Sequence, residues 1–226
     1  MMDFKNDYIN LVVLGSFNPA ILTHEFLVRE CGFNLPSGPD SKGPVMPVVA
    51  FASLEYGNLS FFADLGRLQI MEKNCADPKG SRIPQYLQTY LDKLPYTPII
   101  KCGVNFSYRL AVDISRLGQI TQWMRNDRDK FCKALKLNTI TIEVVFTADQ
   151  SKEEVVSWIL RTKADRYDAT TMLKVAMPSP SNEPKIDFNY EVAGLDKDRK
   201  RLSSVTTSYG EVLDLFKGQA EKIFAG

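Results

Sequence analysis

The sequence contains a single histidine, His24, and this scarcity limits the chemistry available to it. A Ser-His-Asp or Cys-His catalytic site needs a histidine as proton acceptor, so any such site would have to use His24. The four cysteines, Cys31, Cys75, Cys102 and Cys132, are widely spaced and include no C-x-x-C pair, whereas structural zinc sites draw their ligands in close pairs. We therefore expect free thiols, no metal, no cofactor and no catalytic residue.

The sequence also lacks an excess of charge, an export signal and a long hydrophobic run. Lys and Arg number 28 against 27 Asp and Glu, a formal net charge of +1. Proteins dedicated to nucleic acid gain much of their affinity by neutralising phosphates, so this balance disfavours that role. The start, MMDFKNDYIN, has no basic segment followed by an apolar core, and the longest apolar stretches are too short to span a bilayer. We expect a cytoplasmic protein without membrane association.

The composition is that of a folded α+β protein with antiparallel sheets. Hydrophobic residues make up 44% and charged residues 24%, an ordinary globular balance. The order predicted for residues 1–112 is β-α-β-β-α-β, the split ferredoxin-like unit. Apolar runs and helical spacing predict strands over 9–16, 48–56, 59–72 and 99–110 and helices over 18–31 and 84–94, with a two-residue hairpin turn at Gly57-Asn58.

A long helix and a second ferredoxin-like half, β-α-β-β-α, are predicted for residues 113–226, packed with the first half as one compact unit. A capping-box pattern at Ser151 and Glu154 indicates a helix over 151–163, although its β-branched residues also suit a strand. The alternation in 185–192 places Ile186, Phe188, Tyr190 and Val192 in the core. The remaining elements are a helix over 114–136, strands over 139–147 and 170–177, a charged loop over 196–201, and a last helix from about Ser208 with Val212, Leu215, Phe216, Ile223 and Phe224 on its core face.

The sharpest local motif is GSFNP, residues 15–19, followed by His24. It resembles the start of the nucleotidylyltransferase superfamily, where a first strand leads into G-S-F-N-P, then H-x-G-H and a helix. Ile21 and Thr23 replace the first histidine and the glycine of that second motif. The resemblance implies a diverged nucleotide site with Ser16, Asn18 and His24 as ligand-binding residues, the histidine stabilising phosphate charge.

The GSFNP segment also has a purely structural interpretation, as a strand end, a turn and a capped helix start. The Asn18 side chain would accept from free backbone amides, and Pro19 fits the first helical position. Further along, LSSVTT at 202–207 is a looser echo of the family's phosphate-binding I-S-S-T-x-x-R segment, with Val205 and Ser208 at the threonine and arginine positions.

Two other patterns could mark a binding site. KCGVNFSY at 101–108 faintly resembles the core strand of the RNA-recognition motif, but Phe106 and Tyr108 fall on one face that is more typical of a core. Asp187 and Glu191 share one face of a strand about 13 Å apart. That distance exceeds the reach of one metal ion, so we expect both carboxylates to face solvent.

These observations favour a non-enzymatic intracellular component that binds a protein partner or a second copy of itself. The second predicted half lacks its last strand, and an uncovered sheet edge can accept a strand from another chain. The alternatives are the diverged nucleotide-binding protein and an RNA-binding sheet. A structure of residues 9–56 separates the first two, because a nucleotide fold is parallel there and a ferredoxin-like unit is antiparallel.

Overall fold

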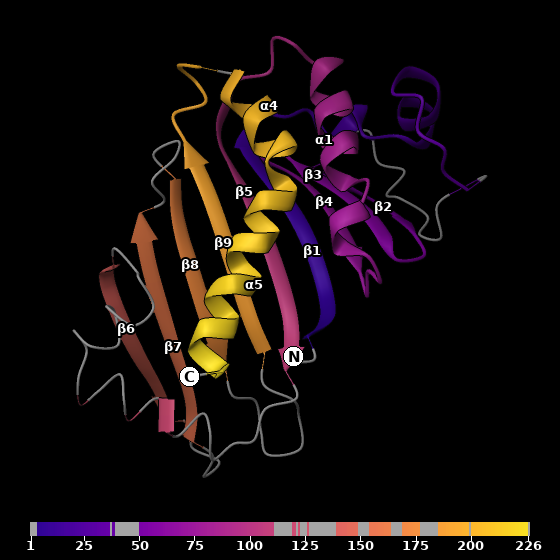
Figure 1. Ribbon diagram of the computed structural model, residues 1–226. Helices are drawn as coiled ribbons and strands as arrows, with labels where there is room; N and C mark the ends of the chain where they lie inside the picture. Colours follow the sequence, from indigo (N-terminus) through magenta and orange to yellow (C-terminus); the bar gives the residue numbers. More distant parts are fainter. Residues whose placement is uncertain are drawn as a thin grey trace. The chain divides into compact units, whose positions relative to one another are not determined.

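The computed structural model describes residues 4–36, 38, 50–110, 119, 120, 122, 126, 139–148, 154–163, 169–176, 185–198 and 200–225. They form an α+β protein with antiparallel strand pairs (Figure 1). The strands are β1 Phe4–Gly15, β2 Phe51–Tyr56, β3 Leu59–Asp64, β4 Arg67–Lys73, β5 Ile99–Leu110, β6 Thr139–Ala148, β7 Glu154–Lys163, β8 Ala169–Ala176 and β9 Lys185–Ala193. The helices are η1 Pro19–Ile21, η2 Phe26–Glu30, η3 Pro78–Gly80, α1 Ile83–Asp92, α4 Lys200–Thr207 and α5 Tyr209–Ala225.

The chain divides into two compact units, each assembled from separated segments. The first unit comprises Met1–Asp7, Phe106–Tyr190 and Gly210–Gly226, and the second comprises Tyr8–Asn105 and Glu191–Tyr209. The strand order is β1-β5-β9-β8-β7-β6 within the first unit and β2-β3-β4-β1-β5-β9 within the second. Since β1, β5 and β9 each contribute residues to both units, the units are described one at a time below.

In the second unit the predicted hairpin is confirmed, but the single strand predicted over 59–72 is two strands, β3 and β4. β2 and β3 pair antiparallel around Gly57-Asn58, with Tyr56 opposite Leu59, and Gly57 takes the positive φ of +58° that the turn requires. The predicted strand 59–72 is broken at Leu65-Gly66, where the Asp64 carboxylate accepts from the Gly66 amide at 2.8 Å. This extra hairpin places three strands between the helices, so the ferredoxin-like order is not confirmed.

The core of the second unit lies between one face of its sheet and α1, which crosses β3 and β4 in Figure 1. Alternation along β1 buries Ile9, Leu11 and Val13 to 1% exposure or less, as the period of two requires. The predicted helix 84–94 is α1, with Leu87 and Tyr90 buried at 1% or less.

A further helix in the second unit was missed from the sequence. The predicted loop and phosphate-segment echo over 196–207 are instead a turn followed by α4 (Lys200–Thr207). Its apolar residues Leu202 and Val205 are each 2% exposed, and Thr206 Oγ1 lies 3.1 Å from Gln88 Oε1 of α1. Packing against α1 therefore holds a helix that its short, hydroxyl-rich sequence does not predict.

In the first unit the predicted helix 151–163 is wrong, because the segment is strand β7 (Glu154–Lys163). It pairs antiparallel with β6 on one side and β8 on the other, with Trp158 opposite both Val144 and Val175. Two strand partners outweigh a local capping signal, and the β-branched residues noted in the sequence suit the strand. The predicted strands 139–147, 170–177 and 185–192 are confirmed as β6, β8 and β9.

The core of the first unit is built on aromatic rings. β9 buries Ile186, Phe188 and Tyr190 to 5% or less, as predicted, and its Val192, in the second unit, is fully buried. On α5, Phe216 is fully buried whereas Leu215, also predicted for the core, is 42% exposed and faces away.

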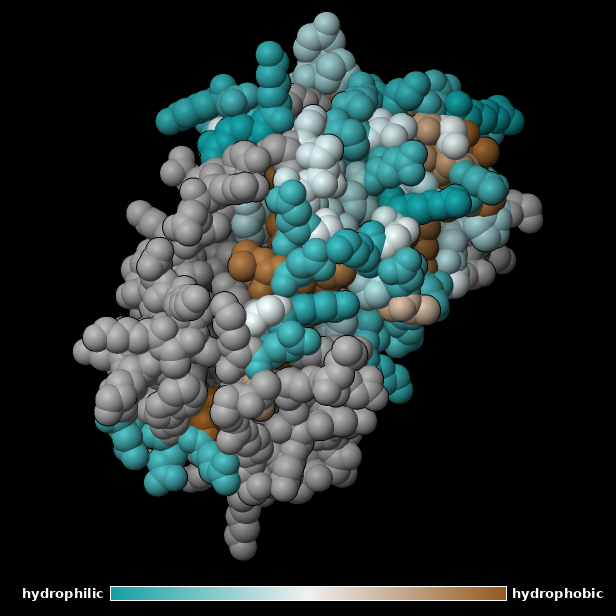
Figure 2. All heavy atoms as spheres, in the orientation of Figure 1, coloured by the Kyte–Doolittle hydropathy of each residue, from teal (hydrophilic) through white to brown (hydrophobic). Residues whose placement is uncertain are grey.

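The helix predicted over 114–136 is described only at residues 119, 120, 122 and 126, which are helical. Residues 39–49, residues 177–184 and Cys132 lie outside the described residues. Within the described part of the chain, no helix combines the length and apolar character needed to cross a bilayer. On the face drawn in Figure 2, hydrophilic side chains cover most of the coloured surface and hydrophobic ones show in small areas.

Candidate functional site

The GSFNP segment forms the end of β1, a tight turn and a short helix. The Ser16 amide donates to the Pro98 carbonyl oxygen at 3.0 Å, and a Cβ at Gly15 would lie only 2.3 Å from that same oxygen. Asn18 Oδ1 accepts from the Ala20 amide at 3.1 Å and caps η1. Glycine and asparagine at these positions thus have structural roles, while the Ser16 side chain is exposed.

His24 opens the second helical segment and is bound to a neighbouring strand. Thr23 Oγ1 accepts from the Phe26 amide at 3.1 Å, which starts this segment anew after η1. His24 Nδ1 lies 2.9 Å from the hydroxyl of Tyr56, whose burial raises its pKa to about 12 and keeps it protonated at neutral pH. The side chains of Asn18 and His24 therefore both have partners within the protein, and a nucleotide site there stays a prediction.

The RNA-binding alternative loses its platform in the structure. Phe106 is fully buried and Tyr108 is 1% exposed, so neither ring can stack on a base. Lys101, the first residue of the KCGVNFSY segment, forms an ion pair with Glu191 at 3.0 Å.

The carboxylates of β9 are bound to the protein as well as facing outward. Asp187 Oδ1 accepts from the hydroxyl of the fully buried Ser107 at 2.6 Å, and Glu191 pairs with Lys101 as above. The predicted outward orientation of Asp187 and Glu191 is confirmed, and β5 supplies each with a polar partner that the sequence did not indicate.

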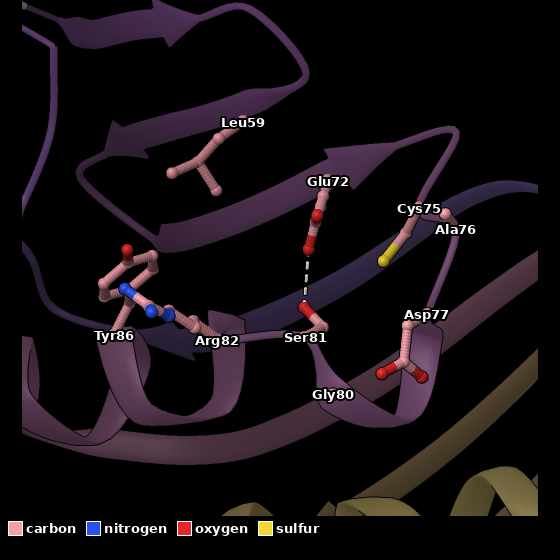
Figure 3. Close-up of a pocket in the computed structure, with 9 residues that line it drawn as sticks. All are labelled: Leu59, Glu72, Cys75, Ala76, Asp77, Gly80, Ser81, Arg82 and Tyr86. Carbon is pink, nitrogen blue, oxygen red and sulfur yellow. Dashed lines mark hydrogen bonds between the residues drawn. The ribbon is translucent and has the colours of Figure 1, made fainter.

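An open cavity of about 400 Å³ lies in the second unit, where β3 and β4 meet the turn that leads into α1 (Figure 3). Its walls come from the start of β3, the end of β4, η3 and the first turns of α1. After β4 the chain turns sharply at Asn74, with φ +50°, and Gly80 lets the Asp77 carboxylate lie against the backbone, where a Cβ would be 2.3 Å from Oδ2. Cys31, Cys75 and Cys102 are free thiols, and Cys75 lines this cavity.

Glu72 forms the floor of the cavity. It occupies the inward register of β4 after Leu68 and Ile70, and it accepts a hydrogen bond from the Ser81 hydroxyl at 2.6 Å. Ser81 Oγ in turn accepts from the Ile83 amide at the start of α1 at 3.3 Å. The carboxylate is thus held at a fixed position at the end of a buried strand face.

The cavity thiol is a poor nucleophile. Burial, the charge of Glu72 and a hydrogen bond to Glu72 together raise the pKa of Cys75 to about 11. At neutral pH it is a neutral group, so the cavity favours binding over covalent chemistry. Among the described residues, no group of three metal-ligating side chains is present.

The sequence singled out none of the cavity residues, because they come from four elements and share no spacing. One local signal was available: Glu72 interrupts the inward apolar alternation of β4, and an acidic residue at an inward strand position needs partners.

Comparison with known proteins adds little. No protein-family model matches the chain, and no curated protein matches it. Among solved structures, it is similar to a rolling circle replication initiator protein from Geobacillus stearothermophilus, with a TM-score of 0.33, 8% identity, and coverage of 90% of this chain and 80% of that one. A structure described as KH domains gives a TM-score of 0.20 and 9% identity, covering 89% of this chain and 83% of that one. Likenesses this distant carry no argument about fold family or function.

Proposed function

We propose that this chain is a non-enzymatic intracellular protein that binds a protein partner by adding a strand of that partner to the outer edge of β2. The observation that supports this is the position of β2. It ends the strand order of the second unit, so among the described strands only β3 pairs with it. A sheet edge presents backbone donors and acceptors in a row, and an extended peptide can satisfy them.

The register of the hairpin tells which residues of β2 offer these groups. A two-residue turn closes on a hydrogen-bonded pair, here Tyr56 and Leu59, and such pairs alternate with non-hydrogen-bonded ones. The backbone groups of Tyr56, Leu54 and Ala52 therefore point toward β3. Those of the intervening residues, Ser53 above all, point toward the outer edge, away from β3.

Side chains beside the edge suit an added strand. Phe51 is 49% exposed and stacks on Phe62, with ring centroids 6.0 Å apart, and the Arg67 guanidinium lies 4.7 Å from the Phe62 ring centre. Natural edge strands are usually protected by lysine, proline or a bulge, whereas FASLEY carries only Glu55 as a charge. The partner we expect is thus an extended segment with an apolar side chain opposite Phe51.

The test is a pair of substitutions at Ser53. Ser53→Pro removes the outward amide and blocks strand addition while leaving the ladder to β3 intact; Ser53→Ala keeps the amide and is the control. We expect wild type and Ser53→Ala to capture the same protein from cells, with cross-links to 51–56, and Ser53→Pro to lose it. A folded Ser53→Pro variant that keeps the same partner would contradict strand addition at β2.

A further inference from the structure

The cavity beside Glu72 differs from the β2 edge in both position and chemistry. Its volume of about 400 Å³ lies within the range of small-molecule sites, about 300–1,000 Å³. It also gathers three charged side chains, Glu72, Asp77 and Arg82, around one hollow. A site of this size with a few converging polar groups is suited to a small ligand rather than to a protein chain.

None of these three charges is paired with an opposite charge among the described residues. The ion pairs of the second unit involve other side chains, such as Arg29 with Glu25 and Lys101 with Glu191. A half-buried carboxylate without a counterion is left to find its opposite charge in solution or in a ligand.

The charges are arranged in two groups. In Figure 3, Arg82 and Tyr86 lie at one end of the cavity and Asp77 with Cys75 at the other, with Glu72 reaching in from β4. Negative charge therefore gathers toward one end and positive charge toward the other. Leu59 is drawn between Tyr86 and Glu72. The side chains of Leu59 and Tyr86 give the cavity its apolar surface.

We propose that this cavity binds a small zwitterion with an ammonium group and a carboxylate at opposite ends of a short apolar chain. The ammonium lies at Glu72 and Asp77, and the carboxylate is bound by the Arg82 guanidinium. The apolar middle contacts Leu59 and Tyr86. The Ser81 hydroxyl and the Cys75 thiol are hydrogen-bonded to Glu72 and fix its carboxylate before the ligand arrives. Little ordering of this side chain is therefore required on binding.

Matched probes test both charged ends. The zwitterions 4-aminobutanoate, 5-aminopentanoate and 6-aminohexanoate cover three lengths, pentylamine keeps only the ammonium, and pentanoate keeps only the carboxylate. Binding is measured by calorimetry on the full chain. We expect at least one zwitterion to bind with a Kd below about 1 mM and each single-charge analogue to bind about tenfold or more weakly, because each loses one charge-assisted hydrogen bond.

Exposed charges permit substitutions that spare the fold. Arg82 makes no capping bond through its side chain, so Arg82→Gln should weaken the zwitterion about tenfold and leave pentylamine unchanged. Asp77→Asn should weaken the zwitterion and pentylamine but not pentanoate. Arg29→Gln and Asp92→Asn make the same charge changes elsewhere on the surface of this unit and should alter nothing.

Two results would overturn the proposal. One is the failure of all three zwitterions to bind more tightly than about 1 mM. The other is binding that Arg82→Gln and Asp77→Asn leave unchanged, which would place the ligand outside this cavity. Neither result bears on strand addition at β2, because no substitution used here touches that edge.

Discussion

Replacing Phe216 by alanine tests the aromatic core of the first unit. The ring is fully buried, and its aromatic neighbours include Tyr108 at 5.1 Å, Phe188 at 5.2 Å and Phe106 at 6.1 Å between centroids. Removing a buried phenylalanine costs about 3–5 kcal/mol, and each ring pair adds about 0.5–1.5 kcal/mol beyond its buried area. We expect Phe216→Ala to lose at least about 4 kcal/mol, a large part of the 5–15 kcal/mol typical of a folded domain.

The neighbouring residue provides the control. Leu215 is 42% exposed, so Leu215→Ala removes little buried surface and gains helix propensity, and it should change the free energy of unfolding by less than about 1 kcal/mol. Urea unfolding followed by circular dichroism gives both values at one temperature. Phe188→Ala, alone and combined with Phe216→Ala, then measures the coupling of the two rings, expected at about 0.5–1.5 kcal/mol.

This reasoning is refuted if Leu215→Ala lowers the free energy of unfolding as much as Phe216→Ala, or more. If Leu215→Ala destabilised the protein as much as Phe216→Ala, α5 would present a different face to the sheet from the one described. If the two ring substitutions were additive within about 0.3 kcal/mol, Phe188 and Phe216 would not be in contact.

Three further predictions concern single positions. Gly15→Ala should lower the free energy of unfolding by about 1–3 kcal/mol, because an added Cβ has no room there. Gly218→Ala, with open space around it in α5, should raise the free energy of unfolding by about 0.5–1 kcal/mol, and chemical unfolding measures both changes. Asp187→Ala should cost about 1 kcal/mol by the same measurement because buried Ser107 loses its acceptor, and a silent substitution would mean that this bond contributes nothing. Cys75, with its pKa raised from 9.0 to about 11, should react with iodoacetamide at pH 8 about 100-fold more slowly than a free cysteine. The folded state favours the protonated thiol, so the stability that this thiol contributes is complete below pH 9 and is lost as the pH rises through about 11. Cys75→Ser should reduce this loss of stability at high pH.

Local patterns in the sequence predict much of the second unit. The Gly57-Asn58 turn, the alternation of β5 and the spacing of α1 all depend on short-range chemistry, and the structure confirms them. The break at Leu65-Gly66 was missed although the sequence marks it. The buried positions change phase there, from Phe61 and Ala63 to Leu68 and Ile70, and the Asp64 side chain accepts from the Gly66 amide.

Two elements that depend on distant partners were not predicted. Residues 154–163 carry a helix-start signal, but pairing with β6 and β8 makes them a strand. α4 has few strong helix formers and is held by its contact with α1. The same reason applies to the sites: Ser16, Asn18 and His24 form a recognisable motif along the chain, whereas Glu72, Asp77 and Arg82 come together only through the fold.

The interleaving of the two units along the chain has a consequence for synthesis. The second unit needs residues 191–209 to complete it, and the whole of 106–190 must leave the ribosome first. The first unit cannot close until 210–226 has also emerged. Closing such long loops delays productive folding, and the apolar strands 4–15 and 99–110 remain without their full set of neighbours during that time. The nascent protein should therefore depend on chaperones more than its size suggests, and cutting the chain at any single point should yield no independently stable half.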